Sequence, residues 1–133
     1  MARSKDAPSG TLLESEARIA SAYSEQMIND GGYRGLLLSF KETAHAASPT
    51  VTPTIQYRDP ATGSWVTYKE LTAITGEGTF DALIYPMGLA GASWNVSAPT
   101  DVVAGPIPYI WRLLMSAADA DSCTYSAGYQ YIS

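Results

Sequence analysis

The sequence predicts an all-β protein folded as a two-sheet antiparallel β-sandwich of the jelly-roll or immunoglobulin-like type, with about seven or eight strands. Two observations lead to this prediction. From Tyr33 to Ser126, apolar and polar residues alternate in short segments, and Gly, Pro and Asp interrupt them about every ten residues. With 133 residues, 46% of them hydrophobic, the chain is also long enough to build one packed core.

The N-terminal part of the chain contains an arm and then an ambiguous segment. Residues 1–10 are polar and are expected to form a flexible arm, which leaves residues 11–133 as a single sandwich domain. Between Leu12 and Ile28 the apolar residues nearly fit helical spacing, so the local pattern favours a helix. A strand is the alternative, because residues 17–22 also alternate. Asn29-Asp30-Gly31-Gly32 predicts a turn in either case.

The next segments predict a strand and a hairpin. Leu36, Leu38 and Phe40 lie on one side of the first strand. Residues 51–58 alternate in the same way, and Pro53 places the start of this second strand at a sheet edge. The segment 59–63 (Asp-Pro-Ala-Thr-Gly) predicts a hairpin loop in which Gly63 adopts a positive φ, and residues 64–68 form the return strand.

Three further strands are expected in the C-terminal half. Residues 79–85 alternate, and residues 86–99 are rich in Gly, Ala and Ser, which predicts a long loop crossing one end of the sandwich. Residues 107–115 are the most hydrophobic run, as is typical of a central strand. After a turn at residues 119–121 comes the last strand, one face of which carries Cys123, Tyr125, Ala127, Tyr129 and Tyr131.

Composition argues against several classes of partner. The formal net charge of −5 disfavours a nucleic-acid partner, since phosphate binding requires a basic surface. No segment is long and apolar enough to span a membrane, and residues 1–10 lack the apolar core of a signal peptide. A single cysteine, Cys123, cannot form an internal disulfide, which fits synthesis in a reducing cytoplasm. We therefore expect a soluble protein with no nucleic-acid or membrane partner.

No set of residues has the spacing of a catalytic centre, so we expect a non-enzymatic protein with no catalytic, cofactor-binding or metal-binding residues. His45 is the only histidine, which excludes a conventional Ser-His-Asp triad or a histidine-based zinc site. Asp119 and Asp121, with Asp101, could supply oxygen ligands to calcium, but the remaining ligands of a calcium loop are missing and a turn is favoured.

Contacts with a partner are the remaining route to function. Aromatic residues on loops are frequent anchors of protein–protein contacts, and a polar arm can become ordered on a partner. The expected partner-binding residues are Arg3, Lys5, Leu12, Leu13 and Trp94. The alternative is a carbohydrate-binding module that stacks sugars on exposed aromatic rings. Its candidate residues are Trp65, Tyr68, Trp94, Tyr109, Trp111, Tyr129 and Tyr131.

An ordered set of short motifs, from about Leu12 to the C-terminus, resembles a known family. The motifs are Arg34-Gly35-Leu36, residues 49–56, residues 59–63, Tyr85-Pro86, Trp111-Arg112, residues 118–122, Thr124-Tyr125-Ser126 and Gly128. Together they resemble the small virion structural proteins of tailed bacteriophages, common in phages of actinobacteria.

The resemblance implies a β-sandwich on the outside of an assembled capsid, or less often in the tail or at the head–tail connection. It also implies an extended chain before Tyr33 and no catalytic residues. The expected function is therefore capsid decoration. The expected partners are the major capsid protein and further copies of the chain, a trimer being favoured. The expected location is the virion surface, after synthesis in the cytoplasm of the bacterial host.

Overall fold

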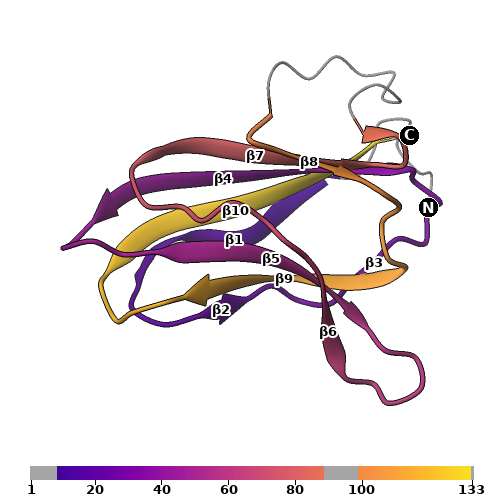
Figure 1. Ribbon diagram of the computed structural model, residues 1–133, viewed down its shortest axis with the longest axis horizontal. Helices are drawn as coiled ribbons and strands as arrows, with labels where there is room; N and C mark the ends of the chain where they lie inside the picture. The colour runs from indigo at the N-terminus through magenta and orange to yellow at the C-terminus, as the bar shows by residue number, and fades with distance from the viewer. Residues whose placement is uncertain (1–8, 89–98, 133) are drawn as a thin grey trace.

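The computed structural model describes residues 9–88 and 99–132, and in these residues ten strands form two five-stranded sheets that pack face to face (Figure 1). Sheet A has the order β1 (Ser9–Arg18), β10 (Cys123–Ile132), β4 (Gly35–His45), β7 (Gly78–Tyr85) and β8 (Asp101–Ala104). Sheet B has the order β2 (Ala22–Tyr23), β9 (Ile110–Ala117), β5 (Val51–Arg58) and β6 (Trp65–Glu70), and β3 (Met27–Ile28) also pairs with β9. The predicted all-β sandwich is confirmed.

Two details of that prediction need correction. The strand count is higher than seven or eight because the short strands β2, β3 and β8 were not anticipated. The pairing is antiparallel except between β7 and β8, which run parallel. Of the predicted loop 86–99, residues 89–98 lie outside the described part of the chain. Within that described part, no helix has the length and hydrophobicity needed to cross a bilayer.

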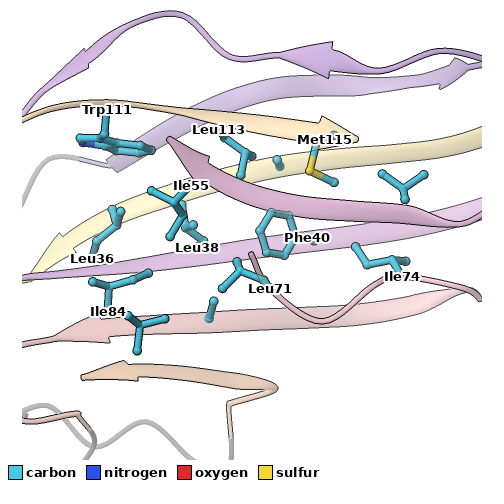
Figure 2. Packing of buried hydrophobic residues seen from close by; sticks show 14 of the residues in the cluster. Leu36, Leu38, Phe40, Ile55, Leu71, Ile74, Ile84, Trp111, Leu113 and Met115 are labelled. Carbon is cyan, nitrogen blue, oxygen red and sulfur yellow. The ribbon is translucent and has the colours of Figure 1, made fainter. Parts of the chain in front are cut away.

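The core is made largely by alternate residues of the long strands. Leu36, Leu38 and Phe40 of β4 are at most 3% exposed, and they face β5 and β9 across the interlayer space (Figure 2). The inward residues of β9, Trp111, Leu113 and Met115, are fully buried. Strand β9 lies inside sheet B, between β2 and β5, as expected for the most hydrophobic run of the chain.

An aromatic cluster joins the two sheets at one end of the core. Trp111 of β9 donates a hydrogen bond from Nε1 to the hydroxyl of Tyr131 on β10, at 3.0 Å. The rings of Tyr129 and Tyr131 meet the indole edge-to-face, with centroids 6.5 and 6.3 Å away. Tyr33 stacks on Tyr131 with a centroid distance of 5.2 Å. The cluster therefore adds a polar bond between the sheets to their apolar packing.

The helix favoured by the local pattern between Leu12 and Ile28 is wrong, because this segment contains the end of β1 and the short strands β2 and β3. The strand alternative is correct in type, but residues 19–21, part of the alternation that suggested it, connect β1 to β2. Strand β1 pairs antiparallel with β10, beginning at Ser9, inside the predicted arm. Its register shifts between Thr11 and Leu13, so Leu12 and Leu13 both pack against the core although they are consecutive. A β-bulge of this kind interrupts the period-2 pattern and makes an edge strand look helical in sequence.

The prediction that Pro53 marks a sheet edge is also wrong. Strand β5 is interior, flanked by β9 and β6. Past the end of β6 the chain still follows β5: the amide of Leu71 donates to the carbonyl of Pro53, and Val51 exchanges backbone hydrogen bonds with Ile74. This side of β5 is therefore paired through the carbonyl of Pro53 and through both backbone groups of Val51, although proline has no N–H to donate.

The predicted turns are confirmed. In the β5–β6 loop, Asp59 and Ser64 are joined through their backbones, and Gly63 has φ +76°. The Asp59 carboxylate accepts hydrogen bonds from the Ala61 amide at 3.1 Å and from the Thr62 hydroxyl at 2.7 Å. These local bonds hold the hairpin, which projects from the sandwich body in Figure 1.

Candidate interaction surface

A band of aromatic and arginine side chains crosses the outer face of sheet B. Because Trp111 and Leu113 point into the core, Arg112 between them points out of it. Arg112 pairs in register with Gln56 on β5, and Arg58 pairs with Trp65 on β6. On the other side of β9, Tyr23 pairs with Leu114. We call the set Tyr23, Gln56, Arg58, Trp65 and Arg112 the aromatic–arginine band.

The guanidinium of Arg112 is the centre of the band. Its Cζ lies 4.2 Å from the ring centroid of Tyr23 and 4.5 Å from that of Trp65. The strand order places these rings on opposite sides of β9, so the cation lies between them. Its Nε donates to Gln56 Oε1 at 2.7 Å, which fixes the orientation of the guanidinium plane. Cation–π contacts and this hydrogen bond hold a surface arginine in one position.

The band is cationic in an acidic protein. Among the described residues, neither Arg112 nor Arg58 has a carboxylate oxygen within 4.0 Å of its nitrogens. Tyr23 is 53% exposed, while Trp65 and Arg112 are half-buried. Trp, Tyr and Arg are the residues that contribute most often to the binding energy of protein interfaces. The band therefore has the composition of a docking surface for an acidic partner.

A groove of about 550 Å³ opens beside Arg58, at one end of the band. One wall comes from the end of β5 and the hairpin loop, and includes Tyr57, Arg58 and Pro60. The other wall comes from the chain that enters β9, with Pro108, Tyr109 and Ile110. Apart from Arg58 and the loop residues Asp59 and Gly63, these walls are aromatic or aliphatic.

A buried polar cluster joins β4 to β10 inside the sandwich. The fully buried carboxylate of Glu42 accepts a hydrogen bond from the Cys123 thiol at 2.8 Å, and its other oxygen lies 3.0 Å from His45 Nδ1. Burial and the contact with Glu42 raise the pKa of the Cys123 thiol to about 12. The thiol is therefore protonated at neutral pH, and such a group is a poor nucleophile. Cys123 is itself buried.

The aspartates considered as calcium ligands make other bonds. Asp119 Oδ1 accepts from the amide of Asp121, whose own carboxylate accepts from the amide of Ser48. Asp101 accepts from both the amide and the hydroxyl of Thr72. In residues 9–88 and 99–132, no three His, Cys, Asp or Glu side chains gather in a way that could hold a metal ion. The turn predicted at residues 119–121 is confirmed.

The residues predicted to bind a partner are only partly in the described chain. Leu12 and Leu13 are half-buried on β1 and pack against the core. Arg3, Lys5 and Trp94 lie outside the described residues. Sequence reasoning did not find Arg112 or Tyr23. Arg112 had a visible signal, since it is the one charged residue in the most hydrophobic run of the chain and alternates with buried positions.

The aromatic residues considered for sugar stacking fall into separate groups. Trp111 and Tyr131 are buried in the core, and Tyr129 packs against it. The hydroxyl of Tyr68 donates to the carbonyl of Pro106. Trp65 stacks on Arg112, and Tyr109 is 63% exposed in the groove. These side chains do not form one flat platform, because they are divided between the core and the surface.

The comparisons with known proteins give little further information. No family model matches the sequence, and no curated protein matches it. Among solved structures, the chain is similar to the SPBc2 prophage-derived protein YomS, with 11% sequence identity and a TM-score of 0.45 over 94% of each chain. At this identity and this TM-score, the likeness does not transfer a function from one protein to the other.

Proposed function

We propose that the protein is a non-enzymatic virion structural protein of a tailed bacteriophage, which binds the outside of the major capsid lattice through the aromatic–arginine band. The observation that carries the docking role is Arg112, held between Tyr23 and Trp65 on the surface without a carboxylate partner in the described chain. The ordered motifs that resemble small phage virion proteins support the virion as the place where this docking occurs.

The proposed mechanism is mechanical. Each copy contacts neighbouring capsid subunits and adds buried surface across joints that the pressure of the packaged genome tends to open. A preorganised band suits this role, since side chains that are already ordered lose little further conformational entropy on binding. We propose that the copies form closed oligomers, with a trimer favoured because it matches local three-fold axes of a shell.

A carbohydrate-binding module is less well supported by the same surface. Sugar stacking needs exposed aromatic rings that offer a common flat face. In the band, Tyr23 and Trp65 each turn a ring face toward the guanidinium between them, so they do not lie side by side in one plane. A glycan array tests this alternative directly, and glycan binding that is lost on Trp65→Ala would favour it.

The experiment that tests the proposed function is the copy number of the protein in purified phage particles, measured against the major capsid protein by quantitative mass spectrometry. The expected result is a ratio near one or near one-third. A ratio near one means one copy for each capsid subunit, and a ratio near one-third means one copy for each three-fold site of the lattice. A handful of copies per particle would instead place the protein in the tail or at the head–tail connection. Absence from particles would overturn the virion role.

A further inference from the structure

We infer that the groove beside Arg58 is a socket for an extended acidic segment of the protein partner, with one apolar side chain between the groove walls and a carboxylate on the Arg58 guanidinium. This inference deepens the proposed docking role. It rests on the proposed function only for the identity of the partner. The expected chemistry of the segment, an apolar side chain and a carboxylate, is inferred from the residues that line the groove.

The walls of the groove are held in place before any ligand arrives. The hairpin wall is closed by backbone hydrogen bonds between Asp59 and Ser64 and between Gly63 and Asp59. The opposite wall is fixed because the amide of Asn29 donates to the carbonyl of Tyr109 at 2.9 Å, and Ile110 pairs with Ile28 of β3. A preformed groove lined by aromatic and proline side chains suits an extended peptide, as in the recognition of polyproline-type segments.

The positive charge of Arg58 favours an acidic segment. Arg58 uses Nε to bind the Gly63 carbonyl at 3.3 Å and one terminal nitrogen to bind Gln26 Oε1 at 2.8 Å. Its other terminal nitrogen, Nη2, has no hydrogen-bond partner within the part of the chain that the structure describes. The guanidinium is thus oriented by two neutral acceptors and keeps donors for a carboxylate, which is the acceptor that guanidinium binds best.

The carboxylate of Asp59 also lines the groove, but its hydrogen bonds go to its own loop rather than to Arg58. Its two oxygens accept hydrogen bonds from the Ala61 amide and the Thr62 hydroxyl, and it forms no ion pair with Arg58 within 4.0 Å. The groove is also continuous with the aromatic–arginine band through Arg58 and its register partner Trp65. A partner seated on the band therefore has an adjacent socket for a protruding segment.

The test is a titration of the isolated ¹⁵N-labelled protein with two matched peptides, acetyl-Glu-Phe-Pro-Glu-amide and acetyl-Gln-Phe-Pro-Gln-amide, followed by amide chemical shifts. The acidic peptide is expected to give saturable shifts at Tyr57, Arg58, Tyr109 and Ile110, and the neutral peptide to bind about five-fold more weakly. Arg58→Gln should remove the difference in affinity between the two peptides. Lys41→Gln, which removes an exposed cation from β4 on the other sheet, should leave the difference in affinity between the peptides unchanged.

Tyr109→Ala supplies a second check, because a side chain that is 63% exposed can be truncated without opening the core. It should weaken both peptides, since it removes part of an apolar wall. The inference is overturned if no shift saturates in the groove, if the two peptides bind equally, or if Lys41→Gln acts as Arg58→Gln does. The titration uses no virion, so the two tests are independent. A negative titration would not affect the proposed virion role, and absence of the protein from particles would not affect the proposed binding of an acidic segment in the groove.

Discussion

The hydrogen bond between Trp111 and Tyr131 is expected to contribute measurably to holding the two sheets together, and Trp111→Phe tests this. The substitution keeps an aromatic ring but removes the indole N–H, which lies 3.0 Å from the Tyr131 hydroxyl. The smaller ring leaves a cavity of roughly 40 Å³, which at about 24 cal/mol per Å³ lowers the free energy of unfolding by about 1 kcal/mol. The buried Tyr131 hydroxyl also loses its donor, which costs about 1–3 kcal/mol.

The expected total is a loss of about 2–4 kcal/mol in the free energy of unfolding, measured by urea titration with far-UV circular dichroism. The matched control is Tyr131→Phe, which removes the acceptor and leaves the ring in place. In the double variant both polar groups are absent, so its loss should be smaller than the sum of the single losses by about 1 kcal/mol or more. Losses that add to within about 0.5 kcal/mol would refute the reasoning, because they would show no coupling between the two groups.

Three further predictions concern single groups. Cys123, whose thiol pKa is raised to about 12, should resist iodoacetamide at neutral pH in the folded protein and react once urea unfolds it; rapid labelling of the folded state would contradict its burial. Gly63→Ala should lower the free energy of unfolding by about 1 kcal/mol because φ is +76°, whereas Gly76→Ala, in open space, should change it by less than about 0.5 kcal/mol; equal effects would be inconsistent with the turn. Hydrogen bonds from Thr62 and Ala61 lower the pKa of Asp59 below 3.8, so its contribution to stability is present above that pH and is lost as the pH falls; wild type should therefore lose more stability on acidification than Asp59→Asn, and identical acid profiles would argue against this.

The sandwich was predictable because its long strands are buried on one face. Alternation in β4 and β10 follows directly from that geometry: it placed Leu36, Leu38 and Phe40 on one face and Tyr125 and Ala127 on another, and all five are buried. The errors arose where non-local contacts decide the structure. In the segment between β2 and β3, Ser24 Oγ accepts the amide hydrogen of Leu113, a bond between residues 89 positions apart. No local pattern predicts that a serine side chain will replace a backbone acceptor there.

The interaction surface was less predictable than the fold. Alternation alone places Arg112 on the outer face of its strand, opposite the core. Its ring partners, Tyr23 and Trp65, come from a two-residue strand and from the far side of β5, and only the strand order brings them together. The sequence does not specify that order, because many pairings of the ten strands would bury the same inner faces.

The most direct test of the docking surface is cosedimentation of the recombinant protein with phage particles that lack it, compared across wild type, Arg112→Gln and Lys41→Gln. Circular dichroism would first confirm that both variants fold. The account predicts that Arg112→Gln binds at least about ten-fold more weakly than wild type, since it removes the cation at the centre of the band, and that Lys41→Gln binds as wild type does. Equal binding by all three proteins would contradict docking through the outer face of sheet B.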